Sequence, residues 1–211
     1  MNKMRVTFTS GDLLLEGIAA EPQGAGPFPA VIVCHPHPLY GGSMDNNVVD
    51  NFCQALTKAS FVSLKFNFRG VGASQGEFGK GIGEQADVEA AISFISTLEQ
   101  IDPERIGLAG YSAGAGFGLP LGCSDGRIKA LAAISPPLNM FDFDFLQDCP
   151  KPKLLIAGGR DNFTPADQLL EFCRNLVEPR QYEIIEGADH FWWEHESCLA
   201  AKVTDFFLEV L

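Results

Sequence analysis

The sequence predicts an α/β fold, a mostly parallel eight-stranded sheet with helices on both faces. Short apolar and β-branched runs alternate with longer segments in which apolar residues recur every three or four positions, as in an amphipathic helix. Most strands are separated by enough residues for a helical crossover, which parallel strands require. The first two strands are joined only by the turn of residues 10–12, Ser-Gly-Asp. The sheet is therefore expected to begin with an antiparallel hairpin.

Eight strands and five helices can be placed along the chain. Strands are expected at residues 6–8, 13–20, 30–34, 62–66, 106–110, 130–134, 154–157 and 182–185. Helices are expected at residues 45–59, 84–98, 113–122, 165–177 and 197–211. The sequence has no internal repeat, low-complexity segment or long linker, so residues 1–211 are expected to form a single domain.

The composition limits the classes of molecule that the protein is expected to bind. Residues are 46% hydrophobic and 20% charged, and the net charge is −12 without any basic stretch, so repulsion opposes binding to nucleic acid or an anionic membrane surface. No apolar run approaches the roughly 18 residues of a membrane span, and the start lacks a signal-peptide pattern. The six cysteines show no CxxC spacing and indicate reduced, packed thiols. We therefore expect a cytoplasmic protein, a monomer or homodimer, that acts on a small molecule.

Residues 110–114, Gly-Tyr-Ser-Ala-Gly, match the pattern G-x-S-x-G between a predicted strand and a predicted helix. In this pattern the serine lies on a sharp strand-to-helix turn, and the flanking glycines avoid collisions with neighbouring elements. The turn lifts the Ser112 hydroxyl out of the sheet, where a substrate can reach it. Glycine and serine are common residues, so the pattern indicates a nucleophile only together with partners at the same edge.

Asp161 and His190 are the expected partners. Asp161 ends a Gly-Gly-Arg-Asp turn after the seventh predicted strand, and His190 follows the eighth. Active sites of open α/β sheets lie at the carboxyl ends of the strands, where these residues meet. A serine hydroxyl needs a neutral imidazole to accept its proton, and a carboxylate fixes the tautomer of that imidazole. The sequence thus predicts Ser112 as nucleophile, His190 as base and Asp161 as orienting acid. The alternative acids follow the sixth predicted strand: Asp142, Asp144 and Asp148.

With two further loops, these motifs make the chain resemble small bacterial α/β-hydrolase proteins related to dienelactone hydrolases and short-chain carboxylesterases. The loops are residues 35–46, His-Pro-His-Pro-Leu-Tyr-Gly-Gly-Ser-Met-Asp-Asn, and residues 67–76, Asn-Phe-Arg-Gly-Val-Gly-Ala-Ser-Gln-Gly. The motifs occur in the family's order over nearly the whole chain. The resemblance implies an α/β-hydrolase fold and hydrolysis of small carboxylic esters through an acyl-enzyme, without a cofactor or metal. The segment between the sixth and seventh predicted strands is too short for a cap domain.

The resemblance also implies an oxyanion hole, a pair of N–H groups that stabilise the charged intermediate. Ala113, directly after the nucleophile, supplies one donor. The other comes from the loop after the third predicted strand, in which prolines have no N–H. The remaining candidates are His37, Leu39 and Tyr40, of which Leu39 is favoured. An apolar pocket is expected to include four aromatic residues: Tyr40, Tyr111, Phe141 and Trp192.

Three other functions remain open. The first is a lactone or dienelactone hydrolase, although such enzymes usually carry cysteine where this chain has Ser112. The second is a related peptidase, although such peptidases usually have a large gating domain. A non-catalytic binding module would commonly have lost one of the three catalytic residues. His35 and His37 are not expected to bind a metal, because no carboxylate or cysteine lies at ligand spacing.

Overall fold

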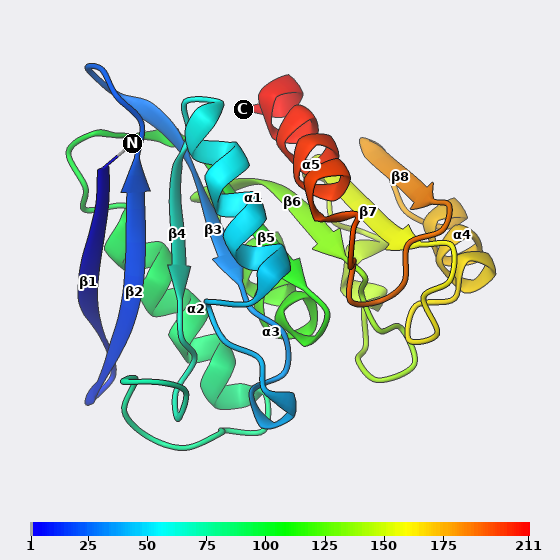
Figure 1. The fold of residues 1–211 in the computed structure, drawn as a ribbon, viewed down its shortest axis with the longest axis horizontal. Helices are drawn as coiled ribbons and strands as arrows, with labels where there is room; N and C mark the ends of the chain where they lie inside the picture. Colours follow the sequence, from blue (N-terminus) through cyan, green and yellow to red (C-terminus); the bar gives the residue numbers. More distant parts are fainter. Residues whose placement is uncertain (1) are drawn as a thin grey trace.

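A computed structural model describes residues 2–211, and at its centre lies an eight-stranded sheet in the order β1-β2-β4-β3-β5-β6-β7-β8 (Figure 1). The strands are β1 (Asn2–Ser10), β2 (Leu13–Glu21), β3 (Phe28–Cys34), β4 (Val62–Phe66), β5 (Ile101–Tyr111), β6 (Ile128–Ile134), β7 (Lys153–Gly158) and β8 (Arg180–Ile185). The β1–β2 and β2–β4 pairs are antiparallel, and the remaining pairs are parallel. The predicted α/β fold with its antiparallel start is confirmed.

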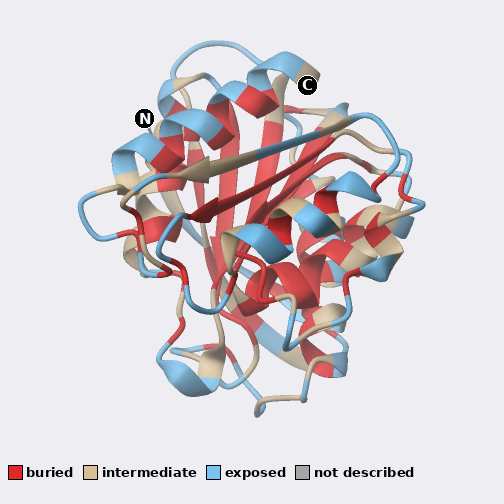
Figure 2. Cartoon of the chain, turned by 90° about the vertical axis from the view of Figure 1, so that its right-hand side faces the viewer, coloured by how far each residue is buried: buried red, intermediate tan, exposed pale blue. Residues whose placement is uncertain are grey.

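Five α-helices cover the two faces of this sheet. They are α1 (Asn47–Lys58), α2 (Ile82–Ile95), α3 (Ala113–Ser124), α4 (Ala166–Arg174) and α5 (Glu196–Val210). α1 and α5 pack against one face of the sheet through one cluster of buried apolar residues. α2, α3 and α4 pack against the other face through a second cluster. Figure 2 shows the strands buried between the helices, whose outer sides are exposed. Both faces of the central strands are therefore apolar, as the continuous apolar runs in the sequence predict.

The structure extends β5 to Ile101, five positions before the strand start expected at residue 106. The added residues include Asp102, Glu104 and Arg105, whose side chains are partly or fully exposed. Phe28 of β3 pairs with Ile101, and the register between these strands shifts before the regular pairing resumes. A hydrophobic pattern does not detect this strand start, because residues 102–105, Asp-Pro-Glu-Arg, separate the buried Ile101 from the apolar run that begins at residue 106.

Between β6 and β7, residues 135–152 contain only the short 3₁₀-helix η2 (Asp144–Leu146). This segment carries no cap over the carboxyl ends of the strands, in agreement with the prediction. Among residues 2–211, the structure has no helix that combines the length and the apolar character needed to cross a membrane.

The loop between β4 and α2 is held by a buried ion pair. Arg69 Nη2 lies 2.7 Å from Asp87 Oδ1, and the Arg69 backbone N–H donates to Asp87 Oδ2 at 2.9 Å. The Asp87 side chain is fully buried, so its charge is compensated by several hydrogen bonds to one residue. A Cβ on Gly83 would lie 2.7 Å from Arg69 Cδ, which explains glycine at that position. The pair fixes the loop between β4 and α2 against the first turns of α2.

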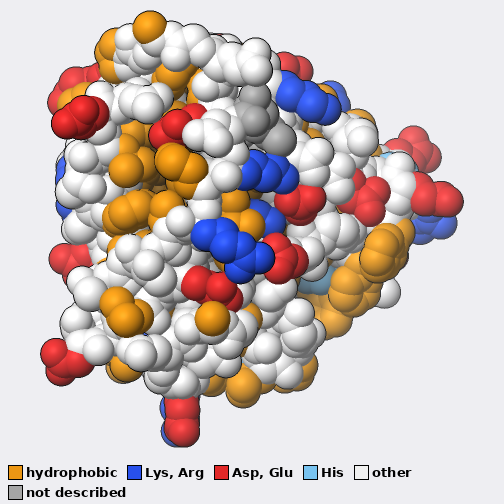
Figure 3. All heavy atoms as spheres, turned by 60° about the vertical axis from the view of Figure 1, so that its left-hand side comes forward, with side chains coloured by type: hydrophobic (Ala, Val, Ile, Leu, Met, Phe, Trp, Pro, Cys, Tyr) orange, Lys and Arg blue, Asp and Glu red, His pale blue; other side chains and the backbone are white. Residues whose placement is uncertain are grey.

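Charged side chains of both signs are interspersed on the face around β1 and β2 (Figure 3). Although the net charge is −12, this face carries no extended area of a single sign. The mixed charges of this face therefore do not attract a polyanion over a long distance.

Candidate active site

Ser112 lies between the end of β5 and the start of α3, in a strained backbone conformation. Its φ is 54° and its ψ is −124°, a region that residues with a side chain rarely adopt. A Cβ on Gly110 would lie 2.4 Å from Ala115 Cα, and one on Gly114 would lie 2.5 Å from the Cys34 carbonyl oxygen. Both glycines of the G-x-S-x-G pattern are therefore required by close backbone approach, as the sequence indicates.

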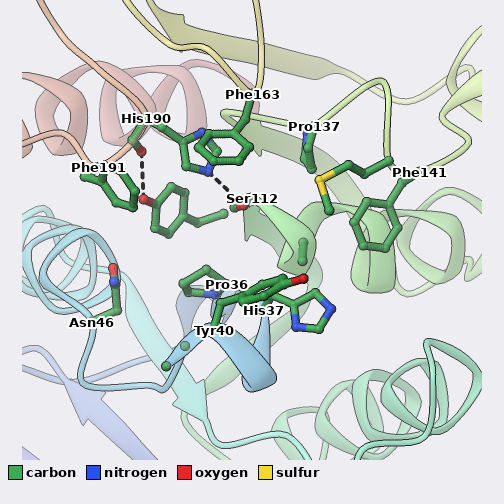
Figure 4. Close-up of a pocket in the computed structure, with 15 residues that line it drawn as sticks. Pro36, His37, Tyr40, Asn46, Ser112, Pro137, Phe141, Phe163, His190 and Phe191 are labelled. Atoms are coloured by element: carbon green, nitrogen blue, oxygen red, sulfur yellow. Dashed lines mark hydrogen bonds between the residues drawn. The ribbon is translucent and has the colours of Figure 1, made fainter.

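Ser112, His190 and Asp161 form a continuous chain of hydrogen bonds. Ser112 Oγ lies 3.0 Å from His190 Nε2 (Figure 4). His190 Nδ1 lies 2.9 Å from Asp161 Oδ2. Asp161 Oδ1 accepts the backbone N–H groups of Phe163 and Thr164, both at 2.9 Å. His190 and Asp161 are buried. The three side chains come from the carboxyl ends of β5, β7 and β8, and each partner can be held in the orientation that proton transfer requires.

Tyr111 holds the backbone beside the imidazole. Its hydroxyl donates to the His190 carbonyl oxygen at 2.7 Å. Burial raises the pKa of Tyr111, and the negative charges of Asp161 and Asp189 raise it further. The hydroxyl therefore stays protonated near neutral pH and remains a donor. Sequence reasoning placed Tyr111 in the pocket wall but did not identify this contact.

A cavity of about 460 Å³ lies above Ser112, and its wall is largely apolar. Tyr40, Phe141, Phe163 and Phe191 line it, together with Tyr111. The Phe163 and Phe191 ring centroids lie 4.6 Å and 5.6 Å from that of His190. The arrangement presents a nucleophile, a base and an apolar surface to one ligand, which is the usual composition of a small-molecule site.

Comparison with known proteins agrees with this geometry. Residues 30–200 match the α/β-hydrolase domain family. The chain belongs to that family. An uncharacterized protein of Rickettsia prowazekii is 35% identical over 192 residues, which are 86% of this chain and 79% of that protein.

Two solved structures are similar to this α/β hydrolase over almost the whole chain. An α/β serine hydrolase homologue from Coxiella burnetii has a TM-score of 0.88 and 30% identity, with 97% of both chains covered. An α/β serine hydrolase without a lid from Xanthomonas campestris has a TM-score of 0.87 and 27% identity, with 99% of this chain and 95% of that chain covered. These relatives confirm the family resemblance seen in the sequence.

In the hydrolase, Leu39 does not occupy the position expected of an oxyanion donor. Its side chain is 67% exposed, and its N–H donates to His37 Nδ1 at 3.2 Å. The N–H of Tyr40 donates to the His37 carbonyl oxygen at 3.1 Å. Leu39 belongs to the short 3₁₀-helix η1 (Pro38–Tyr40), whose turn directs these N–H groups back to His37. The Leu39 N–H is thus engaged within its own loop, and Leu39 is not supported as the second donor; the sequence pattern does not reveal this 3₁₀ turn.

Two N–H groups remain suited to a developing oxyanion. No acceptor is found within residues 2–211 for the His37 N–H, and both His37 and Ala113 line the cavity beside Ser112. The Ala113 N–H is at the first position of α3, where an α-helix offers no intrahelical acceptor. A Cβ on Gly42 would lie 2.1 Å from the Pro36 carbonyl oxygen, so glycine is needed to fold this loop against Ser112.

Trp192 does not line the pocket of the hydrolase. It is fully buried, and its Nε1 donates to Ser135 Oγ at 3.0 Å. Asp189 Oδ1 accepts the N–H groups of Phe191 and Trp192, both at 3.0 Å, and the resulting turn directs Phe191 to the cavity. The prediction of Trp192 is corrected to Phe191. Sequence neighbours of His190 could not be assigned to the two sides of this turn from residue type alone.

His35 has a structural position below the site. It is fully buried, its Nδ1 donates to the Pro36 carbonyl oxygen at 2.6 Å, and its Nε2 accepts the Phe68 N–H at 3.1 Å. Burial lowers the pKa of His35 to about 4, while the hydrogen bond to Pro36 acts in the opposite direction. The imidazole is therefore neutral and connects the loops after β3 and β4. Within residues 2–211, no three His, Cys, Asp or Glu side chains gather in a group that could hold a metal ion.

This burial predicts a stability loss in mild acid. The pKa of His35 is about 6.5 in the unfolded chain and about 4 in the folded protein, so the unfolded state binds more protons between these values and stability falls as pH drops. Urea unfolding at pH 7.5 and pH 4.5 should show a loss of roughly 2–3 kcal/mol from this residue. His35→Gln, which retains hydrogen-bonding groups without titrating, should remove that part of the loss. An equal loss in both proteins would contradict the assignment.

Proposed function

We propose that the hydrolase is a serine carboxylesterase that cleaves small carboxylic esters through an acyl-enzyme intermediate. The observation that carries this proposal is the hydrogen-bonded chain from Ser112 through His190 to Asp161, which ends beneath an apolar cavity. The descriptions of the Coxiella and Xanthomonas proteins as serine hydrolases support the same reaction class.

In the first half of the reaction, Ser112 Oγ attacks the ester carbonyl carbon and His190 Nε2 takes the hydroxyl proton. The carbonyl oxygen becomes an oxyanion, and the N–H groups of Ala113 and His37 stabilise its charge. Asp161 stabilises the imidazolium and keeps the proton of Nδ1 directed toward itself. When the tetrahedral intermediate collapses, the bond from carbon to the alcohol oxygen breaks and His190 returns the proton to the alcohol.

In the second half, water replaces the alcohol as the attacking group. His190 takes a proton from this water as its oxygen attacks the acyl carbon, and a second tetrahedral intermediate forms at the same oxyanion site. Its collapse releases the carboxylic acid and returns the proton to Ser112. The site has no cap, so water and small soluble esters reach Ser112 directly.

Covalent labelling tests the activated nucleophile. A fluorophosphonate should modify the folded protein at one site, and peptide mass spectrometry should place the adduct on Ser112, because a serine hydroxyl without a positioned base reacts slowly. Ser43→Ala is the matched control, since Ser43 lies on the neighbouring loop and its Oγ accepts the Asp45 N–H. That variant should label like the wild type. Absence of labelling in the folded protein would reject the esterase proposal and favour a binding module.

A further inference from the structure

A second cavity lies beside the one above Ser112. Its volume is about 480 Å³, and it shares His37, Met140 and Phe141 with the first cavity, so the two spaces adjoin at these side chains. The second cavity extends between α3, the first turns of α2 and the loop that follows β6. The mechanism described above assigns no role to this space.

Aromatic side chains form much of the second cavity. The Phe78 and Phe117 ring centroids lie 6.3 Å apart, and the Phe117 and Phe141 centroids lie 5.3 Å apart. A Cβ on Gly116 would lie 2.3 Å from the Phe141 ring, so the absence of a side chain there lets Phe141 pack directly on α3. The apolar part of this wall is formed by these packed rings and Met140, while Lys80, Gln85 and Asp142 add polar groups to the rest of it. The apolar part suits a hydrocarbon chain or ring.

The position of His190 decides which part of an ester would enter the second cavity. The alcohol must leave next to His190 Nε2, the atom that returns the proton, and Phe163 and Phe191 flank that side. His37 and Phe141 lie on the opposite side of Ser112 from His190 (Figure 4). The second cavity lies beyond His37 and Phe141, so the acyl part of the substrate is directed toward it.

The distance along α3 sets the acyl length. Gly116 and Phe117 follow Ser112 by four and five residues, which is about 6–7.5 Å along a helix axis. An acetyl group is too short to reach this level, whereas an acyl chain of six or more carbons extends into the second cavity. Lys80 and Asp142, which also line it, are exposed and of opposite charge, so they offer a charged acyl end no net attraction.

We propose that the second cavity is an acyl subsite that binds the distal part of medium-chain, uncharged acyl groups, and that the enzyme prefers such esters to acetates. This inference rests on the proposed esterase function and adds its substrate class. Each methylene that is fully buried there would favour binding by about fourfold. Preference should therefore rise along the series of p-nitrophenyl acetate, butyrate and octanoate.

Gln85→Trp tests the subsite, because Gln85 lines the second cavity and not the first. The bulky indole should lower the ratio of kcat/KM for octanoate to kcat/KM for acetate at least tenfold. Glu89→Trp is the matched control: residue 89 lies one turn further along α2, is exposed, and does not line the cavity. It should leave the ratio unchanged. A ratio that is the same in Gln85→Trp and wild type would overturn the subsite.

Asp142→Trp provides a second test from the opposite wall, at an exposed loop position where folding is less at risk. A separate measurement does not depend on the reaction: calorimetric binding of octanamide to the Ser112→Ala protein, with and without Gln85→Trp. Octanamide binding that is at least tenfold weaker with Gln85→Trp supports the subsite, whether or not any ester is hydrolysed. A lack of ester hydrolysis would reject only the esterase proposal. Equal binding by both proteins, or none to Ser112→Ala, rejects the subsite.

Discussion

Replacing Ser112 by alanine should lower kcat for p-nitrophenyl butyrate by about 10⁴–10⁶, the scale seen when the nucleophile of a serine hydrolase is removed. No other hydroxyl among residues 2–211 is hydrogen-bonded to His190 Nε2. Without Oγ, the base has only water to activate, and the acyl-enzyme cannot form. The measurement is the initial rate of p-nitrophenol release at neutral pH, compared with the wild type.

The control for this experiment is the folded state of the variant. Alanine keeps the Cβ, so the strained φ of 54° is retained and the backbone of the turn is unchanged. Thermal unfolding of Ser112→Ala should therefore differ from the wild type by only a few degrees. If a stable variant hydrolyses the ester at the wild-type rate, Ser112 is not the nucleophile for this substrate.

The sequence was sufficient to predict which elements meet at the site. Ser112, Asp161 and His190 each follow an apolar run, and parallel strands bring their carboxyl ends to one edge regardless of how far apart they are in the chain. The glycines at positions 110 and 114 predicted that the backbone passes close to neighbouring elements there, and the structure shows this close approach. These features depend on local patterns and on the topology of the fold, both of which a single sequence encodes strongly.

The residues that shape the ligand space could not be predicted in the same way. Leu39 and Trp192 do not have the roles predicted for them, because each lies in a short turn. The η1 turn directs the Leu39 N–H to His37, and the turn held by Asp189 Oδ1 buries Trp192 and directs Phe191 to the cavity. Phe163 was not identified because its contact with His190 follows from the backbone of the Asp161 loop. Loop conformation is determined by many weak contacts, which hydrophobic periodicity does not report.

The same Asp161 loop leads to the second prediction. In the wild type, Oδ1 accepts two backbone N–H groups, from Phe163 and Thr164, and His190 Nδ1 lies 2.9 Å from Oδ2 and 3.0 Å from Oδ1. In Asp161→Asn, the amide oxygen must keep the Oδ1 position, because the two N–H donors would repel an NH₂ group. The asparagine NH₂ therefore faces His190 Nδ1 and donates to it.

This donation favours the tautomer with the His190 proton on Nε2, the atom that must accept the proton of Ser112. We expect kcat to fall by about 10⁴, as found for the equivalent change in a serine protease triad, with little change in the cavity. Asp144→Asn is the matched control, since Asp144 is exposed, lines neither cavity, and its carboxylate accepts only the Gln147 side-chain amide. Its activity should resemble the wild type, whereas an Asp161→Asn enzyme of wild-type activity would place the orienting acid elsewhere. The loss should appear in rates of fluorophosphonate labelling as well as of ester hydrolysis, because both reactions need the same proton acceptor.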